Sequence, residues 1–405
     1  MPKCLICKSE YQPFVDFGEM PIANAFATKE QIENEYTFAM KVGHCEGCNM
    51  VQLVDQPDRE KMFHENYAFF SSTSDYMQKH FKNFASSVSA LQKLNKNSFV
   101  VEIGCNDGIM LQNFITDKTP CLGVEPSKNV AEVAMSKGVE VINSFFDQSL
   151  AQKITQTHQK ADAILSANVM CHIPYMHSIY DGVKILLKED GVFIFEDPYL
   201  GEIIEKTSFD QIYDEHVFLF SALSISHLAN MHDLELINVE AQVTHGGSMR
   251  YTIAHKGAKP VSKNVINLIE KEKQLGLDSP QAYEGFADSV NKIRGDLMEL
   301  LHKLKNDGKK VVAYGATSKS TTVTNYFGIT PELVECIYDT TPIKHNKLSP
   351  GAHIPVLPYE QFIESNPDYV LLFAWNHTAE IMKKELKFMR DDRKWITYIP
   401  QVKVV

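Results

Sequence analysis

Apolar and polar positions alternate differently in three parts of the chain. Residues 1–70 carry short strand-like runs, the clearest at 50–54, with turn residues and little helical periodicity. In residues 71–258, short apolar runs are each followed by a helical stretch, and the same alternation returns late in residues 259–405. Strand–helix alternation predicts a mostly parallel sheet covered by helices, so we expect an α/β fold in both later parts.

The expected elements follow these runs along the chain. In the middle part we expect strands at 99–103, 121–124, 139–142, 163–165 and 191–196, and late strands around a Gly-Gly turn at 243–254. The last part should open with two polar helices, 262–274 and 283–306, that act as a linker arm. It should continue with strands at 310–314, 333–338 and 369–373 and a helix at 378–389.

The composition narrows the class of protein. A chain of 405 residues is long enough for two or three domains. Its 40 Lys and Arg against 51 Asp and Glu give a net charge of −11 without a basic stripe, which disfavours nucleic-acid binding. No apolar run reaches the ~18 residues of a membrane helix, and the N-terminus lacks a long apolar signal segment, so we expect a cytoplasmic protein.

Two Cys-x-x-Cys pairs lie in the first part of the chain. Cys4 and Cys7 form one pair, and Cys45 and Cys48 form the other. Two such pairs can complete a tetrahedral site of four thiolates for zinc, which leaves no open position for catalysis. We therefore predict a structural zinc, with a redox dithiol or unrelated surface cysteines as the alternatives.

A strand, a tight turn and a helix start follow one another between Val100 and Gly108. Gly104 permits the turn and the close approach of a ligand, and Gly108 permits close helix packing. A dinucleotide-binding turn would carry glycine where this chain has Asn106. Glu125 ends the next strand, where its carboxylate could accept hydrogen bonds from both ribose hydroxyls of S-adenosylmethionine (SAM). The alternative is a glycine turn without a ligand.

Other residues are expected near the same turn. Phe145 and Phe146 follow the third strand, where adenine contacts usually lie, although core packing is an equal alternative. Asn168 follows another strand at the carboxyl edge of the sheet, where ligands collect. The full set predicted to bind the cofactor is Glu102, Gly104, Asn106, Gly108, Glu125, Pro126, Phe145, Phe146 and Asn168.

Acid–base candidates gather in short polar clusters. The run Tyr213–His216 places titratable side chains next to one another before an apolar stretch, and burying such groups is costly unless they are bonded or used. Histidine is the natural general base near neutral pH, so His216 is the first candidate. His172, His245 and Tyr67 are further candidates, and each could instead have a packing or structural role.

The order of these motifs resembles the zinc-containing, SAM-dependent sugar C-methyltransferases that act on nucleotide-linked 4-keto-6-deoxysugars. The resemblance spans nearly the whole chain. Its motifs are the paired cysteines, Tyr67 with the Ser-Ser-Thr that follows, the glycine turn at 102–108, Asn-Val-x-x-His-Ile-Pro at 168–174, Tyr-x-Glu-His at 213–216 and His-Gly-Gly-Ser at 245–248.

The resemblance implies a domain organisation and roles. Residues 1–70 would form a zinc-binding domain, residues 71–258 a Rossmann-like class I methyltransferase domain, and residues 259–405 a second Rossmann-like domain that helps to hold the nucleotide-sugar. His216 would remove the proton from C3 of the sugar, next to the C4 ketone. The residues implied to orient the sugar or stabilise the enolate are Tyr67, His172, Tyr213 and Glu215.

The last part departs from the family at one turn, Tyr-Gly-Ala-Thr-Ser-Lys-Ser-Thr-Thr at 314–322. Family members commonly have Gly-Ala-Pro-Ala-Lys-Gly-Asn-Thr there, so the identity of the nucleotide is open. The hydroxyl-rich turn could still bind phosphate at a helix N-terminus. The residues expected to bind substrate are His245, Ser248, Tyr314, Lys319 and Asp339, with turn and cap roles as the alternative for Lys319 and Asp339.

Three other functions compete with this interpretation. The protein could methylate oxygen or nitrogen, could be a non-enzymatic scaffold, or could be a nicotinamide oxidoreductase that uses its last α/β part. The expected partner is the nucleotide-linked ketosugar, with no nucleic acid and no membrane. We expect a monomer or a small homo-oligomer.

Overall fold

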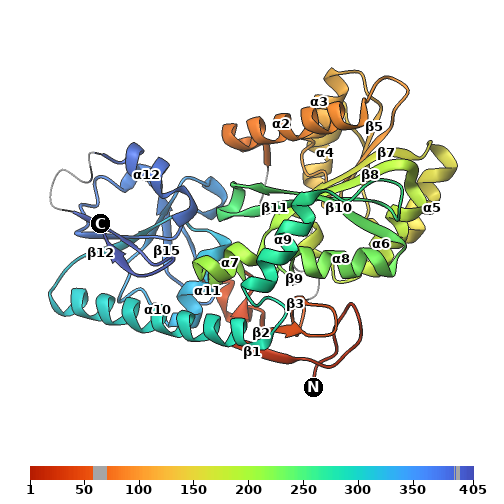
Figure 1. The fold of residues 1–405 in the computed structure, drawn as a ribbon. Helices are drawn as coiled ribbons and strands as arrows, with labels where there is room; N and C mark the ends of the chain where they lie inside the picture. The colour runs from red at the N-terminus through yellow and green to blue at the C-terminus, as the bar shows by residue number, and fades with distance from the viewer. Residues whose placement is uncertain (58–70, 387, 389–392) are drawn as a thin grey trace.

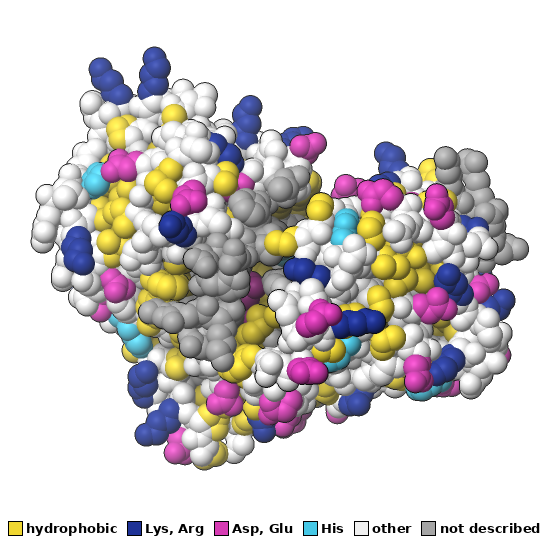
Figure 2. Space-filling view, turned by 180° about the vertical axis from the view of Figure 1, so that it is seen from behind, with side chains coloured by type: hydrophobic (Ala, Val, Ile, Leu, Met, Phe, Trp, Pro, Cys, Tyr) yellow, Lys and Arg dark blue, Asp and Glu magenta, His cyan; other side chains and the backbone are white. Residues whose placement is uncertain are grey.

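The computed structural model describes residues 1–57, 71–386, 388 and 393–405. Their strands form three sheets of four, seven and seven strands. Figure 1 shows the C-terminal sheet in one lobe and the middle sheet in the other, with the N-terminal strands below and between them. Lys and Arg side chains are interspersed with Asp and Glu over the face in Figure 2.

The N-terminal sheet is antiparallel and borrows a strand from the middle of the chain. Its order is β1 (Gln12–Pro21), β2 (Thr37–Cys45), β3 (Met50–Leu53) and β9 (Phe218–Leu219). The strand expected at 50–54 is therefore confirmed to within one residue. Because β9 pairs with β3, the first part of the chain is joined to the middle part by backbone hydrogen bonds.

The middle sheet has the order β10-β11-β8-β7-β4-β5-β6. Its neighbours from β6 to β8 run parallel, and β11 runs antiparallel between β8 and β10. The chain reverses direction across the sheet at β4, which lies between β5 and β7. The strands are β4 (Val100–Ile103), β5 (Cys121–Val124), β6 (Glu140–Ile142), β7 (Ala161–Ala167), β8 (Leu187–Pro198), β10 (Leu234–Gln242) and β11 (Ser248–His255).

Helices cover both faces of this sheet (Figure 1). Two apolar clusters lie on its two faces, which is why its strands are nearly continuous apolar runs. The helices are α2 (Asp75–Gln92), α3 (Leu111–Thr116), α4 (Lys128–Ser136), α5 (Gln148–Thr157), α6 (Met176–Leu186), α7 (Leu200–Lys206) and α8 (Ala222–Met231).

The C-terminal sheet is a second α/β unit with the order β14-β15-β13-β12-β16-β17-β18. Its five central strands are parallel and its two edge strands are antiparallel. The strands are β12 (Val311–Tyr314), β13 (Ile337–Asp339), β14 (Lys347–Leu348), β15 (Pro355–Pro358), β16 (Tyr369–Leu372), β17 (Lys394–Thr397) and β18 (Lys403–Val404). The helices of this part are α9 (Lys263–Gln274), α10 (Pro280–Asn306), α11 (Ser318–Phe327) and α12 (Thr378–Lys384).

Several expected boundaries differ from the structure. In 243–254 only β11 is a strand, because His245 has a positive φ of 54° and the residues before Ser248 form a turn. The strand expected from 333 begins at Ile337, since a turn closed on Thr330 precedes it. The helix expected to reach 389 ends at Lys384.

The two polar helices expected to form a linker arm are packed instead. The buried carboxylate of Glu272 in α9 accepts hydrogen bonds from Ala222 N and Leu223 N at the start of α8, at 2.7 and 2.9 Å. One apolar cluster includes residues of β1, β2, α7, α10 and the C-terminal sheet. The domain limits at 70 and 258 stay predictions.

Among the described residues, none of the helices has the length and apolar content that crossing a membrane requires.

Candidate functional site

The four paired cysteines converge on one point. Cys4 Sγ lies 3.5 Å from Cys48 Sγ, and Cys7 Sγ lies 3.4 Å from Cys45 Sγ. One sulfur from each of the four lies within 4.8 Å of the others. Tetrahedral zinc with Zn–S bonds of ~2.3 Å requires sulfurs in this range. These side chains therefore fit zinc, and four thiolates leave it no open position.

The zinc cluster is docked on the middle part of the chain. His177 of α6 donates from Nε2 to Ile6 O at 2.8 Å, inside the first knuckle. Leu5 N donates to Gln52 Oε1 at 3.0 Å. The cysteines share an apolar cluster with the middle sheet. The metal therefore stabilises an N-terminal part that has little core of its own.

The glycine turn after β4 is held in its ligand-binding shape by the strand beside it. Asn106 N donates to Glu125 Oε2 at 2.9 Å, and Ser127 N donates to Glu125 Oε1 at 2.8 Å. Gly104 has a φ of +72°, and a Cβ there would lie 2.4 Å from a methyl group of Val169. This turn thus accepts only glycine at that position, and it lies where the order of strands reverses, as ligand sites in α/β sheets do.

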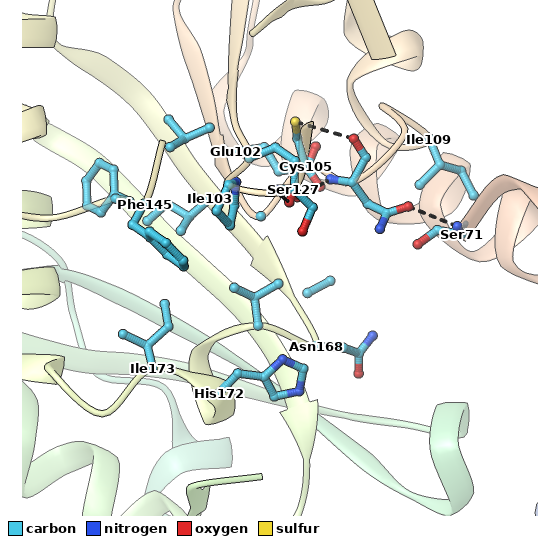
Figure 3. Close-up of a pocket in the computed structure, with 18 of the residues that line it drawn as sticks. Ser71, Glu102, Ile103, Cys105, Ile109, Ser127, Phe145, Asn168, His172 and Ile173 are labelled. Atoms are coloured by element: carbon cyan, nitrogen blue, oxygen red, sulfur yellow. Dashed lines mark hydrogen bonds between the residues drawn. The ribbon is translucent and has the colours of Figure 1, made fainter. Parts of the chain in front are cut away.

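A pocket opens between this turn and the end of β7 (Figure 3). Glu102, Cys105 and Ser127 lie on one side of it, with Asn168 and His172 on the other. Of the residues predicted to bind the cofactor, its lining includes Glu102, Gly104, Asn106, Glu125, Pro126, Phe145, Phe146 and Asn168.

Two residues predicted to bind the cofactor, Gly108 and Phe146, belong mainly to the packing behind the pocket. Gly108 lies behind the turn, where a Cβ would come within 2.9 Å of Val139, so it serves helix packing. Phe146 is buried in the core, whereas Phe145 is partly exposed at the pocket. Tyr67 lies outside the described residues.

Helix α2 also lines the pocket, through Met77 and Phe81, and Ser71 lies just before it. Ser71 N donates to Asn106 Oδ1 at 3.0 Å. The sequence alone indicated no function for α2. Its amphipathic pattern was readable, but nothing local indicated that its apolar face closes over a ligand.

The pocket is acidic. Burial raises the pKa of Glu102 well above its ordinary value, and the nearby charges of Glu125 and Asp107 raise it further. Burial also raises the pKa of Glu125, although the N–H groups of Ser127 and Asn106 oppose this. Among the described atoms, Glu102 Oε2 and Asn168 Oδ1 are buried without a hydrogen-bond partner. A cationic ligand with hydroxyl donors, such as SAM, would complement these groups.

His216 lies beside this pocket, on the loop that follows the short helix η4 (Phe209–Gln211). Its Nδ1 donates to Gln211 O at 2.6 Å. The hydrogen bond to a carbonyl fixes the tautomer, so Nε2 of the neutral ring carries the lone pair. Burial lowers the pKa of His216 well below its ordinary value, and His172 lowers it further. The imidazole is therefore neutral and able to accept a proton.

Aromatic contacts connect His216 to the other predicted residues. Its ring centroid lies 5.4 Å from that of His172, which lines the pocket, and 4.1 Å from that of Tyr213. Cys171, His172 and His216 also have donor atoms within 4.8 Å of one another. We assign no metal to them, because the two imidazoles are stacked at 22° and in-plane lone pairs of stacked rings do not converge.

The N-terminal part of the chain holds the same loop. Ala23 N donates to Asp214 Oδ1 and Asn24 Nδ2 donates to Glu215 Oε1, both at 2.9 Å. Burial raises the pKa of Glu215. No motif surrounds Asn24 in the sequence. Its role in holding the loop depends on its contact with Glu215, which lies 191 residues further along the chain.

The C-terminal lobe contributes Lys319, at the start of α11. Its Nζ lies 4.8 Å from the ring of Trp375 and donates to His245 O and Asn376 Oδ1, both at 3.4 Å. Burial lowers the pKa of Lys319 to about 8. His245 itself lines the cofactor pocket. Lys319 and the pocket therefore meet at the turn that carries His245.

Three other residues expected to bind substrate have polar groups engaged within the protein. Ser248 Oγ donates to Thr244 O at 3.0 Å, and Tyr314 OH donates to Glu385 Oε1 at 3.2 Å. The two carboxylate oxygens of Asp339 accept backbone N–H groups, from Ala316 and Thr341, each at 2.7 Å. These contacts support the turns around the site.

Three hydroxyls of the turn at 314–322 bond to backbone oxygens, while the expected phosphate site at the N-terminus of the helix that follows stays a prediction. Thr321 Oγ1 donates to Ala23 O at 2.9 Å, and Thr322 Oγ1 donates to Ile212 O at 2.8 Å. Ser320 Oγ donates to Thr317 O at 2.5 Å. Thr321 and Thr322 thus fasten the C-terminal lobe to the other two parts of the chain.

The order of the strands in the middle sheet and the pocket at its edge define a class I SAM-dependent methyltransferase. Family models match along the chain: a zinc binding domain at residues 4–63, a methyltransferase domain at 76–239 and a C-methyltransferase C-terminal domain at 243–400. C-methyltransferase NovU of Streptomyces niveus is 31% identical over 408 aligned positions, which cover 100% of this chain and 96% of NovU. The chain belongs to this family of zinc-containing, SAM-dependent C-methyltransferases.

Two solved structures illustrate the more distant likeness. A SAM-dependent methyltransferase of Anabaena variabilis is 17% identical, covers 43% of this chain and 84% of its own, and has a TM-score of 0.34. Magnesium protoporphyrin IX methyltransferase of Synechocystis is 12% identical, covers 44% of this chain and 79% of its own, and also has a TM-score of 0.34.

Cys45→Ser should lower the zinc content of the purified protein and its soluble yield, because the fourth thiolate and the folding free energy of the metal site are lost. Metal content by mass spectrometry measures this. Cys121→Ser is the matched control, since Cys121 lies on β5 outside the cluster. Full zinc occupancy in Cys45→Ser would contradict the four-cysteine assignment.

Glu125→Ala should weaken SAM binding by roughly 1.5–3 kcal/mol, the scale of hydrogen bonds to a charged group. It removes both the carboxylate that faces the pocket and the acceptor that shapes the Asn106 turn. Calorimetric titration measures the dissociation constant. Glu132→Ala, on the exposed side of α4, should leave the constant unchanged, and an unchanged constant in Glu125→Ala would remove Glu125 from the site.

Proposed function

We propose that this C-methyltransferase adds a methyl group to C3 of a nucleotide-linked 4-keto-6-deoxysugar, with His216 as the general base. The observation that carries the proposal is the buried, neutral imidazole of His216, whose Nδ1 is bonded to Gln211 O and whose ring stacks on His172 at the cofactor pocket. A neutral imidazole with the lone pair on Nε2 is the form of the side chain that can take a proton from a C–H bond next to a ketone.

His216 Nε2 takes the proton from C3, and the C–H electron pair moves toward the ketone oxygen as an enolate. Bound SAM would supply the electrophilic methyl group for the enolate carbon, with S-adenosylhomocysteine as the leaving group. His172 and Tyr213 border His216 and are proposed to orient the sugar and stabilise the enolate oxygen. Glu215 is proposed to support this wall of the site through Asn24, and Tyr67 stays a prediction.

The nucleotide half of the substrate is proposed to bind at the carboxyl edge of the C-terminal sheet. The strand order reverses there at β12, between β13 and β16, and ligands of open α/β sheets bind at such points. Lys319 follows β12 and provides a cation for the diphosphate. His245 lies between Lys319 and the cofactor pocket, so a substrate that spans both would pass His216.

We also propose that the protein works in the cytoplasm, as expected from its sequence. All eight cysteines are free of disulfide bonds, which suits a reducing compartment. The size of the assembly, monomer or small homo-oligomer, stays a prediction.

His216→Ala should abolish the exchange of the sugar C3 hydrogen with deuterated water, measured by NMR without a methyl donor. We expect a loss of about 100-fold or more, the usual contribution of a general base. His302→Ala, on the exposed side of α10, is the control. If His216→Ala exchanges C3 deuterium at the wild-type rate, another group is the base.

The value of kcat/KM should fall on the alkaline side with an apparent pKa near that of Lys319, about 8. The lysine loses its proton as the pH rises through this value, so the attraction for the diphosphate is present below it and lost above it. His216 does not contribute to this limb, because the pKa of its imidazole is lowered well below its ordinary value.

Lys319→Arg is the matched variant for this profile. A guanidinium stays charged over the whole range, so the alkaline limb should move to higher pH. Two results would contradict the role of this lysine. One is a pH profile of kcat/KM that stays flat through the pKa of Lys319, and the other is an alkaline limb that lies at the same pH in Lys319→Arg as in the wild type.

A further inference from the structure

Asp210 connects the loop of His216 to the C-terminal lobe. It lies in η4 with its side chain fully buried, at 0% exposure. Its Oδ2 accepts hydrogen bonds from Trp375 Nε1 at 2.7 Å and from Tyr398 OH at 2.6 Å. Trp375 follows β16 and Tyr398 follows β17, so one carboxylate oxygen is bonded to two separate turns at the carboxyl edge of that sheet.

The residue next to Asp210 makes the contacts that shape the site. The backbone oxygen of Gln211 accepts the Nδ1–H of His216 at 2.6 Å. The side-chain amide of Gln211 donates to His245 O. Because Asp210 and Gln211 share a peptide bond, a shift of the Asp210 backbone moves the carbonyl that selects the tautomer and the direction of His216.

Trp375 contacts the other side of the same site. A Cβ on Gly246 would lie 2.5 Å from the Trp375 ring, so the ring packs directly on the backbone after His245. The ring also faces Lys319 Nζ at 4.8 Å. Trp375 therefore touches Asp210, the turn of His245 and Lys319, which are the elements that a substrate spanning the two lobes would meet.

We propose that Asp210 is a positioning residue, bonded to Trp375 and Tyr398, through which the C-terminal lobe sets the orientation of His216. The proposal rests on the proposed function, since it takes His216 as the base. The energetic reason is that a buried carboxylate without its donors is costly. The loop and the lobe are therefore held in one relative position, and the C-terminal lobe acts on the proton transfer as well as on binding.

A purely structural role would make a different prediction. If Asp210 only stabilised the fold, its removal would lower SAM affinity, substrate affinity and turnover together. A positioning role leaves the affinity for S-adenosylhomocysteine unchanged and, with the sugar substrate at saturation, slows the step in which His216 takes the proton. The tautomer of His216 then changes without a change in the cofactor pocket, because Asp210 is not among the residues that line that pocket.

The test uses the full chain with Asp210→Asn, Trp375→Phe and Tyr398→Phe. Trp375→Phe removes the indole N–H but keeps an aromatic ring, and Tyr398→Phe removes only the hydroxyl. Tyr326→Phe, which loses a surface hydroxyl bonded to Asn291, is the control. The measurements are C3 deuterium exchange, affinity for S-adenosylhomocysteine, and the 15N spectrum of the His216 ring.

Asp210→Asn should slow the exchange by about 100-fold, the cost of misplacing a catalytic group by about 1 Å. Its affinity for S-adenosylhomocysteine should equal that of the wild type, and its 15N spectrum should lose the single Nδ1–H tautomer. Adding Trp375→Phe to Asp210→Asn should cause less loss than Trp375→Phe causes alone, since both changes act on the same interaction. If Asp210→Asn does not fold, the variants Trp375→Phe and Tyr398→Phe are sufficient to test the proposal.

Wild-type exchange in Asp210→Asn, or in both Phe variants, would overturn the proposal. A parallel loss of S-adenosylhomocysteine affinity would overturn it in favour of a structural role. His216→Ala separates a failure of the proposed function from a failure of the positioning role. If that variant still exchanges, the proposed function fails; if only Asp210→Asn exchanges normally, the positioning role fails alone.

Discussion

The loop from Ser208 to His216 is buried where the three parts of the chain meet, and buried polar groups must find partners there. The N-terminal part supplies Asn24, the C-terminal lobe supplies Trp375, and the loop supplies its own carbonyl at Gln211. The chain then passes into β9, which pairs with β3 of the N-terminal sheet. The position of the imidazole therefore depends on the packing of all three parts.

This arrangement distributes charge in a way that suits the chemistry. The cofactor pocket carries the buried carboxyl groups of Glu102 and Glu125, whose pKa values burial raises and a cationic methyl donor would lower. On the other side of the turn of His245, Lys319 carries a positive charge that we propose binds the anionic nucleotide of the substrate. Between them, His216 is kept neutral by burial. A single fold thus gathers an acidic, a basic and a neutral proton-accepting region around one turn.

Local patterns predicted most of the strands, the zinc cysteines and the glycine turn, because each depends on neighbouring residues. Long-range pairing could not be read in the same way: β9, only two residues long, joins the N-terminal sheet, and α9 packs on α8 through Glu272. The same limit applies in the site, where Asn24 and Asp210 act through distant partners. The hydroxyls of Thr321 and Thr322 bond to backbone oxygens of other parts of the chain, which the local pattern could not indicate.

A crystal structure with S-adenosylhomocysteine and a nucleotide-linked 4-ketosugar bound together would test the central claim most directly. The quantity to measure is the distance from His216 Nε2 to C3 of the sugar. We predict about 3–3.5 Å, a near-attack distance, with C3 also turned toward the sulfur. A hexose held away from His216, or one whose C3 faces another basic group, would contradict it.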